Sequence, residues 1–371
     1  MKTVKLKDIS INNRGYYGIG ASAVDYDTDK YTYLRITDIN DDGSLNKNGL
    51  MSVDDEKANQ YLLQENDIVF ARTGASTGRN YFYDGEIENM VYAGFLIKFS
   101  LNPELVNPRY IKYYCLSQKY NDWILSSLTG STRPNINEKQ LAEMPIELPE
   151  RQYQDKVVEI MDSLTNKIEL NNEINNNLYK EAVALYKDKF KGIEQGEKTI
   201  GEYIIPKRGK NLLTRDAIEG DIPVVAGGLE PSTYHSQSNT KSPVITISAS
   251  GANAGYTNLW NIPVWASDCS YIDDSITKNV YFWYIVLKTR QNEIYDAQTG
   301  SAQPHIYPQH IAEMPIGELN HVDVEKYNNL VEPLFKMIGN NTRANDRLGY
   351  LRNTLLPKLM NGEINLDEIG E

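Results

Sequence analysis

The stretch Thr129–Ile146, which reads TGSTRPNINEKQLAEMPI, decides the architecture because it occurs twice in the chain. The second copy, Thr299–Ile316, reads TGSAQPHIYPQHIAEMPI and lies 170 residues further along. Ten of the eighteen positions are identical, whereas ordinary residue usage would give about one by chance. The match continues without a gap, which disfavours convergent loop composition. The sequence therefore predicts one structural unit that is used twice.

A long amphipathic segment follows each copy. Its apolar residues alternate at spacings of four and three, as they do in the seam between two paired helices. In the second segment the seam is expected to include Leu330, Met337 and Leu351. The residues that we expect to pair the helices are Leu164, Asn171, Leu178, Leu334, Asn341 and Leu348. A buried Asn in such a seam fixes the register of the pair, and a wet face of an Asn-rich chain is the alternative.

The ends of both segments carry helix signals. Pro149 fits a first helical position and Gly192 a C-cap, while Asn320 is the expected N-cap and Gly362 the expected end of the second helix. A helix of about 40 residues is roughly 60 Å long, and two such helices bury their apolar stripes by packing on each other.

Two prolines interrupt the second segment. Pro333 and Pro357 each remove a backbone hydrogen bond from a helix interior. We therefore expect the second helix to be kinked or broken at these positions.

These signals divide the chain into five parts. They are a first globular domain at 1–149, a spacer helix at 150–191, a second globular domain at 192–318, a second spacer helix at 319–362 and a C-terminal tail at 363–371. The predicted strands are Tyr31–Ile36, Asp67–Ala71, Val91–Phe99, Ile222–Ala226, Val244–Ser248 and Val280–Leu287, with a helical patch at Pro108–Leu125. The expected fold class is α+β, with two α/β domains and two long antiparallel helices that form a coiled coil. A pseudo-two-fold tandem repeat relates the two halves.

Composition excludes several classes of protein. The 38 Lys+Arg and 50 Asp+Glu give a net charge of −12, which taken alone argues against nucleic-acid binding. Net charge is a sum, however, and binding is local. The longest apolar run has eight residues, against the 20 or so of a membrane span, and no signal peptide is expected. Cys115 and Cys269 have neither disulfide-framework nor zinc spacing, which fits a reducing cytoplasm.

Common catalytic signatures are missing from the sequence. Gly74 and Gly78 are separated by three residues and followed by Arg79-Asn80, whereas a P-loop needs four residues and then Lys-Ser/Thr. His305 and His310 are five apart, without an acidic partner of the HExxH kind. We therefore expect a non-catalytic binding module without a metal site.

Stretches without Asp or Glu are the candidates for nucleic-acid contact. Five segments contain no acid and several Lys, Arg, Ser, Thr, Asn or Tyr residues: 68–83, 105–121, 123–137, 203–215 and 231–267. Such side chains bind phosphates and base edges, and ordinary polar surface loops are the alternative. The candidate DNA-contacting residues are Arg72, Thr73, Ser76, Thr77, Arg79, Asn80, Tyr81, Lys112, Arg133, Lys207, Arg208, Lys210, Arg215, Lys241, Ser250, Asn253 and Tyr256.

The motifs together resemble the specificity subunit of type I restriction-modification systems. The segment 67–79, DIVFARTGASTGR, resembles that family's GD-hydrophobic-(S/A)-R-(T/S)-G motif, with Asn66 where Gly is usual. The segment 129–136 resembles its QGSTQPNI motif, and Leu148–Gln152 resembles its PPxxEQ segment. The second domain departs from the pattern, because Ala249 stands where the first copy has Arg72.

The resemblance implies a DNA-recognition subunit without an active site. Each globular domain would be a target-recognition domain that reads one half of a bipartite double-stranded DNA sequence, and the helices would set the spacer between the halves. The implied partners are two methyltransferase (modification) subunits and restriction/translocase subunits, which would hold S-adenosylmethionine, ATP and Mg. The alternative is a coiled-coil adaptor that binds only proteins.

Overall fold

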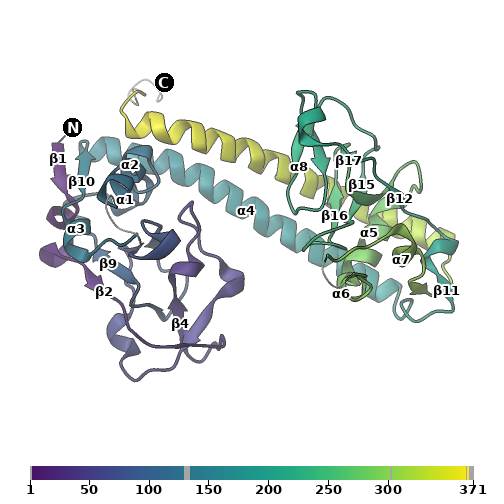
Figure 1. Cartoon of the computed structure of the whole chain (residues 1–371), viewed down its shortest axis with the longest axis horizontal. Coiled ribbons are helices and arrows are strands. Elements are labelled where there is room, and N and C mark those ends of the chain that lie inside the picture. Colours follow the sequence, from purple (N-terminus) through teal and green to yellow (C-terminus); the bar gives the residue numbers. More distant parts are fainter. Residues whose placement is uncertain (1, 129–133, 301–302, 365, 367–371) are drawn as a thin grey trace. The chain divides into compact units, whose positions relative to one another are not determined.

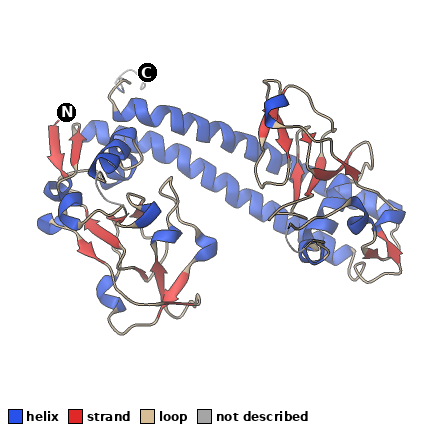
Figure 2. Ribbon diagram, viewed as in Figure 1, coloured by secondary structure: helices blue, strands red, loops and turns tan. Residues whose placement is uncertain are grey.

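The computed structural model describes residues 2–128, 134–300, 303–364 and 366 (Figures 1 and 2). The chain forms two compact units. Unit 1 consists of Met1–Asn166 and Leu348–Glu371, and unit 2 of Lys167–Arg347. Two long helices, α4 (Arg151–Lys189) and α8 (His321–Met360), each contribute one part to unit 1 and one part to unit 2. No helix in the described part of the chain is long and apolar enough to cross a membrane.

Unit 1 contains two four-stranded sheets. The first is antiparallel, in the order β2-β9-β6-β7, and the second has the order β3-β5-β4-β8, with β4 and β8 parallel. Its strands are β1 (Lys2–Lys5), β2 (Tyr16–Tyr17), β3 (Ala23–Val24), β4 (Tyr31–Leu34), β5 (Met51–Val53), β6 (Asp67–Ala71), β7 (Asn80–Tyr83), β8 (Met90–Tyr92), β9 (Leu96–Ser100) and β10 (Pro145–Leu148). Its short helices are α1 (Pro108–Tyr114), α2 (Gln118–Ser127) and α3 (Glu138–Ala142). A separate antiparallel pair, β1-β10, joins the start of the chain to the entry of α4.

Unit 2 has sheets of the same kind. An antiparallel sheet has the order β12-β18-β15-β16, and a smaller one has the order β14-β13-β17, with β13 and β17 parallel. Its strands are β11 (Lys198–Thr199), β12 (Lys207–Arg208), β13 (Ile222–Val225), β14 (Thr233–His235), β15 (Val244–Ser248), β16 (Thr257–Trp260), β17 (Trp265–Ala266), β18 (Cys269–Asp273) and β19 (Pro315–Ile316). Its short helices are α5 (Val280–Thr289), α6 (Gln291–Asp296) and α7 (Pro308–Ala312). The pair β11-β19 corresponds to β1-β10 of unit 1.

Most predicted strands are confirmed. Asp67–Ala71 and Val244–Ser248 match β6 and β15 residue for residue, and both strands are fully buried. The run Val91–Phe99 divides into β8 and β9, because the chain turns between them with Leu96 N donating to Ala93 O. The helical patch Pro108–Leu125 is two helices, since Ser117 caps a new helix after α1 ends.

The prediction of a strand at Val280–Leu287 is wrong, because these residues belong to helix α5. Seven of the eight side chains are buried. A short run that is apolar on all sides has no periodicity that separates a buried strand from a buried helix. In unit 2 the helix packs on β16 and β15, and Phe282 lies 5.0 Å from the ring of Phe190.

The predicted ends of the long helices are largely confirmed. Asn320 caps α8, with its side-chain oxygen accepting from Val322 N at 2.9 Å. Gly362, with φ +69, follows the end of α8, and Gly192, with φ +80, follows the end of α4. Pro149 lies two residues before the first residue of α4 rather than inside it.

Of the kink or break expected at the prolines of α8, the break is wrong, because the helix is continuous from His321 to Met360. Both proline rings lie on exposed positions, so they do not displace packed side chains. Val331 and Phe335 are buried on either side of Pro333, and Leu359 is buried beyond Pro357. The loss of one hydrogen bond at each proline is therefore offset by packing on both sides of it.

Within unit 2, α4 and α8 run antiparallel and bond to each other through asparagines. Asn171 Nδ2 donates to Asn345 Oδ1 at 2.7 Å, and Asn341 Nδ2 donates to Asn175 Oδ1 at 2.9 Å. Asn171 is 2% exposed, so the wet-face alternative is wrong for this residue. Further along, Tyr327 donates to Ala182 O at 2.8 Å. Asn171 and Asn341 do not bond to each other. Asn171 bonds to Asn345, which lies one turn after Asn341, and Asn341 bonds to Asn175, which lies one turn after Asn171.

The predicted seam is only partly correct. Leu164, Leu178, Leu334 and Leu348 are half-buried, whereas Leu330, Met337 and Leu351 are exposed. In unit 2, α8 packs against α5 as well as α4, with Phe335 stacked on Tyr281 at 5.2 Å. This second neighbour turns the buried face of α8 away from the predicted line of residues.

Candidate nucleic-acid interface

The hairpin loop of unit 1 (residues 72–79) connects β6 to β7 and is shaped by two glycines in the left-handed region. Gly74 has φ +74 and Gly78 has φ +92. The backbone N–H of Gly78 donates to Ala71 O at 2.9 Å and closes the loop. A Cβ on Gly78 would lie 2.7 Å from Ile124 Cγ2, so the position has no room for a side chain. Only glycine satisfies both the backbone angle and the close packing here.

The segment that begins at Pro134 holds this loop from one side. Gly74 N donates to Pro134 O at 3.1 Å, and Ile136 N donates to Arg72 O at 2.9 Å. Thr77 adds a side-chain bond to Gly74 O at 2.7 Å. The described end of the repeated TGS…P-x-I motif, from Pro134 to Ile136, thus holds the hairpin loop through backbone hydrogen bonds.

The hairpin loop of unit 2 (residues 249–256) is held by the same backbone bonds. Gly251 N donates to Pro304 O at 3.1 Å, Ile306 N donates to Ala249 O at 3.0 Å, and Gly255 N donates to Ser248 O at 2.7 Å. Gly251 and Gly255 also have positive φ, +81 and +86. We call this common set of backbone bonds the loop frame. The two units contain the same loop frame, although their loop side chains differ.

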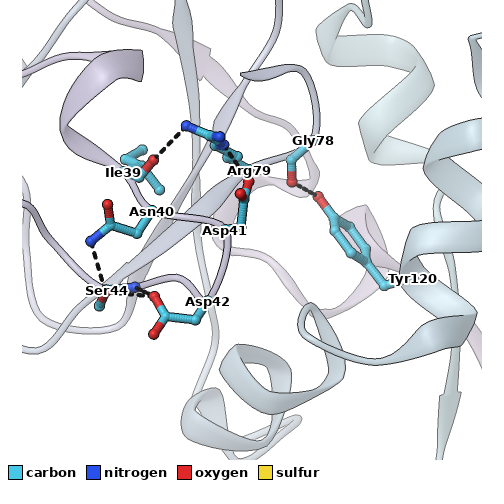
Figure 3. A network of polar contacts seen from close by, with 8 residues as sticks. All are labelled: Ile39, Asn40, Asp41, Asp42, Ser44, Gly78, Arg79 and Tyr120. Atoms are coloured by element: carbon cyan, nitrogen blue, oxygen red, sulfur yellow. Dashed lines mark hydrogen bonds and ion pairs between the residues drawn. The ribbon is translucent and has the colours of Figure 1, made fainter. Parts of the chain in front are cut away.

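Arg79, a candidate for DNA contact, is used inside unit 1 (Figure 3). Its Nε donates to Asp41 Oδ1 at 2.6 Å and its Nη1 to Ile39 O at 3.2 Å. Tyr120 donates to Gly78 O at 2.5 Å next to it. Arg79 therefore ties the segment around Asp41 to the hairpin loop. The acid that pairs with it comes from a different segment, so a stretch without acids in sequence is not free of acids in space.

Two other candidates, Asn80 and Tyr81, are buried inside unit 1 rather than at its surface. Asn80 is 5% exposed, and its side-chain amide donates to Cys115 O at 2.9 Å. Tyr81 is 6% exposed, and burial raises the pKa of its hydroxyl. The strand β7 that carries them is buried along its whole length, which a polar composition does not reveal.

Arg72 is half-buried and keeps its guanidinium next to an aromatic ring. Its Cζ lies 5.0 Å from the ring centre of Tyr17. Its Nε is buried and has no hydrogen-bond partner among the described residues. Thr73 and Ser76 lie half-buried in the same loop. Arg133 lies outside the described residues, and Lys112 lies on α1, with Nζ 5.7 Å from the Tyr113 ring.

The basic candidates of unit 2 are all exposed: Lys207, Arg208, Lys210, Arg215 and Lys241. Arg208 Nη2 donates to Asp268 Oδ1 at 2.5 Å, and Ser250 donates to the other oxygen of the same carboxylate. Arg215 Nε is 3.8 Å from Asp216 Oδ1. Arg208 lies on β12, in the sheet whose strands β15 and β16 carry the hairpin loop. Its counter-ion is Asp268.

Asn253 and Tyr256 lie half-buried at the end of the unit 2 hairpin loop. Asn253 Nδ2 is 3.4 Å from Gly227 O. Lys288 Nζ lies 4.3 Å above the Tyr256 ring and donates to Thr257 O at 2.8 Å. Burial lowers the pKa of Lys288, because desolvation disfavours its charged form.

Sequence reasoning missed three residues of these sites. Asp41 and Asp268 are the counter-ions of Arg79 and Arg208, and Tyr17 is the ring beneath Arg72. Asp268 directly follows the stretch 231–267, which contains no acid. Its position at the end of that stretch was the signal from which a counter-ion could have been predicted. Tyr17 carried no signal. No group of three or more metal-ligating side chains exists in the described part of the chain.

The fold is that of a mixed α+β protein whose two units contain the same loop frame, and a family comparison assigns part of the chain. Residues 1–180 match the family described as the type I restriction modification DNA specificity domain. The match covers just under half of the chain, and over these residues it confirms the resemblance inferred from the sequence motifs.

Curated relatives are named as specificity subunits, and a solved structure has the same fold. The chain is 25% identical over 130 residues to the HindI specificity subunit of Haemophilus influenzae, which covers 34% of the chain and 28% of that relative. It is 24% identical over 301 residues to the MjaIX specificity subunit of Methanocaldococcus jannaschii, covering 70% of each. The crystal structure of the S subunit of a type I restriction-modification system from M. genitalium has the same fold, with a TM-score of 0.62. That likeness covers 96% of this chain and 95% of the other, at 18% identity.

Proposed function

We propose that this chain is the DNA sequence-recognition subunit of a type I restriction-modification complex. Each globular domain reads one half-site of a bipartite double-stranded target, and the long helices set the spacer between the half-sites. The observation that carries the proposal is the loop frame. Two units hold the same backbone arrangement and place different side chains on it, as expected of one recognition device directed at two different sequences.

The residue composition of the loops supports nucleic acid as the ligand. Arg72, Thr73 and Ser76 in unit 1 and Ser250 and Asn253 in unit 2 are the side-chain types that bond phosphates and base edges. None of them is buried. The protein-only adaptor leaves this choice of residues without a role.

The asparagine contacts support a tandem repeat in the helices. Asn171 and Asn341 are 170 residues apart, and so are their partners Asn175 and Asn345. Exchanging the two helices therefore converts the Asn171–Asn345 bond into the Asn341–Asn175 bond. This local two-fold relation is the one expected if each repeat supplies one helix of an antiparallel coiled coil.

Catalysis is assigned to partner subunits. Two methyltransferase subunits and restriction/translocase subunits bind this chain in the cytoplasm, and they carry S-adenosylmethionine, ATP and Mg. The net charge of −12 fits a subunit that binds DNA weakly alone. The rest of the positive surface is supplied by the partners.

Methylation mapping tests the proposal. The chain is co-expressed with a type I methyltransferase subunit from the same organism, and the host genome is sequenced with modified bases detected. The expected result is methylation at a two-part sequence that requires this chain. Methylation independent of the chain, or none together with no duplex binding by the complex, would contradict the proposal and favour the protein-only adaptor.

The role of the helices has a separate test. Insertion of one helical turn between residues 160 and 185 adds about 5.4 Å to a helix. We expect a longer spacer with both half-sites unchanged. Altered half-sites would show that the helices contribute to sequence recognition rather than to spacing.

A further inference from the structure

The loop frame allows each residue of one sheet to be matched to a residue of the other. Gly78 N bonds to Ala71 O in unit 1, and Gly255 N bonds to Ser248 O in unit 2, so Ala71 corresponds to Ser248. Phe70 is paired with Ile97, and Ile247 is paired with Ser270. Ile97 therefore corresponds to Ser270.

One strand further out, the match reaches the outer strands β2 and β12. Tyr17 is paired with Ile97 and Arg208 with Ser270, so Tyr17 corresponds to Arg208. The next residues confirm this alignment. Gly18 N donates to Leu96 O at 3.2 Å, and Gly209 N donates to Cys269 O at 2.8 Å.

The two units carry an arginine at different positions of this common arrangement, one on the hairpin loop and one on the outer strand. Unit 1 has Arg72 on the hairpin loop and Tyr17 on the outer strand, whereas unit 2 has Ala249 on the loop and Arg208 on the outer strand. Arg72 and Tyr17 are in contact, with 5.0 Å between the guanidinium carbon and the ring centre. The two positions are thus neighbours in space. Each unit supplies one guanidinium to this place, from opposite sides.

Both guanidiniums have a fixed neighbour and also keep N–H donors without a partner among the described residues. Arg72 lies over a ring with its Nε unpartnered among the described residues. Among the described residues Arg208 donates only to Asp268, through Nη2, which leaves four of the five N–H donors of a guanidinium. Asp268 corresponds to Phe95, because Arg72 N donates to Phe95 O and Ala249 N donates to Asp268 O. Unit 1 orients its arginine with an aromatic ring, and unit 2 orients its arginine with a carboxylate.

We infer that Arg72 in unit 1 and Arg208 in unit 2 perform the same task, which is to bind a phosphate of the DNA backbone beside the hairpin loop. The inference rests on the proposed function and adds the contact residues. A contact that both domains make from the same place cannot depend on the two different sequences that they read. It is therefore directed at the part common to all duplexes, and a guanidinium binds phosphate through a planar fork of donors.

Relocation of the arginine within its own unit is the sharpest test. In unit 1 the variants are Arg72→Ala and the double variant Arg72→Ala with Tyr17→Arg. In unit 2 they are Arg208→Ala and the double variant Arg208→Tyr with Ala249→Arg. Arg347→Ala, an exposed position on α8, is the control for loss of one positive charge. Each full-length variant is purified with its methyltransferase partner, and binding to a target duplex and to a scrambled duplex is measured over a range of salt concentrations.

Each single variant is expected to bind both duplexes about tenfold more weakly, because a charge-assisted bond is lost. The slope of log K against log salt should fall by about 0.9, the value for one phosphate contact. Both relocation variants should recover affinity and slope, while Arg347→Ala changes neither.

Three outcomes would overturn the inference. They are unchanged affinity in the single variants, a loss confined to the target duplex, which would indicate base readout, and relocation variants that fold but bind like the single variants. Thermal unfolding establishes folding, and the salt slopes of the single variants decide the matter if a relocation variant does not fold. If the wild-type complex binds no duplex at all, the proposed function fails as well. Normal wild-type binding with a failed arginine test overturns this inference alone.

Discussion

The hairpin loops of unit 1 and unit 2 have the same backbone and different side chains. Every bond of the loop frame joins an N–H to a carbonyl, and each has its counterpart in the other unit. The side chains differ at the positions of Arg72 and Ala249, Arg79 and Tyr256, and Tyr17 and Arg208. A frame made of main-chain bonds sets no requirement on side chains except at the glycines. Side chains on the loop can therefore change without a change in the backbone geometry that presents them.

Buried acids show the same kind of exchange. Asp67 opens β6 and is fully buried, with Lys98 Nζ at 2.8 Å and Gln64 N at 2.8 Å. The matching residue of unit 2 is Val244, and the acid stands instead across the strand pair at Asp273. Asp273 has no lysine or arginine within ion-pair distance in the described residues, and it accepts from Lys241 N at 2.7 Å and from Ser275. The buried carboxylate is thus held by a salt bridge in unit 1 and by uncharged donors in unit 2.

The largest expected effect is the difference in unfolding free energy between substitutions of Asp67 and of Asp273. Asp67→Asn leaves Lys98, which is 14% exposed, without its counter-ion, so we expect a loss of about 3 kcal/mol in unfolding free energy. Asp273→Asn keeps an acceptor oxygen and strands no buried cation, so about 1 kcal/mol is expected. Urea unfolding of the two variants measures the difference. Equal losses would show that the Lys98 pair contributes no more than the neutral bonds.

The glycines that follow the outer strands should behave alike in both units. A Cβ on Gly18 would lie 2.2 Å from Tyr92 O, and one on Gly209 would lie 2.4 Å from Ser267 O. Backbone atoms cannot move aside as side chains do, so Gly18→Ala and Gly209→Ala should each cost about 2 kcal/mol. Gly20→Ala, with no atom within 4 Å of its Cβ, is the matched control. Thermal unfolding measures all three, and a neutral Gly209→Ala would break the match of the outer strands on which the arginine exchange depends.

The asparagine pairs of the helices should differ, although they are related by the repeat. Asn345 accepts from buried Asn171 and donates to Asn172, whereas Asn175 accepts a hydrogen bond from half-buried Asn341 alone among the described residues. Asn345→Ala should therefore cost about 2 kcal/mol, and Asn175→Ala about 0.5 kcal/mol. Urea unfolding measures both. The reverse order would show that burial of Asn171 does not decide the strength of its bond.

The smallest effect is expected at Arg79, whose counterpart in unit 2 is the uncharged Tyr256. Asp41 is 85% exposed, and exposed ion pairs contribute less than about 1 kcal/mol. Arg79→Ala should leave the unfolding temperature almost unchanged and speed amide hydrogen exchange around Asp41. Lys47→Ala removes a similarly exposed ion pair, with Glu86, and is the control. A large loss of stability would mean that Ile39 O, the other acceptor of Arg79, is the important partner.

The sequence carried the architecture because repeats and helical periods are local patterns. The copies ending at Ile146 and Ile316, the strands β6 and β15, and the cap at Asn320 were all visible as such patterns. The wrong strand at Val280–Leu287 and the exposed Leu330 have one cause, which is that burial depends on neighbours distant in sequence. The same holds for the candidate interface. Asn80 was placed at the surface on its polarity, and Tyr17 was missed because its role comes from a loop about 55 residues away.

The division of α4 and α8 between the units has a consequence for synthesis on the ribosome. The core of unit 1 includes Val157 and Met161 from α4 together with Leu359, Met360 and Leu366 from the end of the chain. Residues 190–320 must be made between the two helices, which takes on the order of ten seconds at about 5–20 residues per second. During that time the apolar side of α4 is without its partner. The first unit to be synthesised is thus the last to be completed, because its core needs residues from the end of the chain.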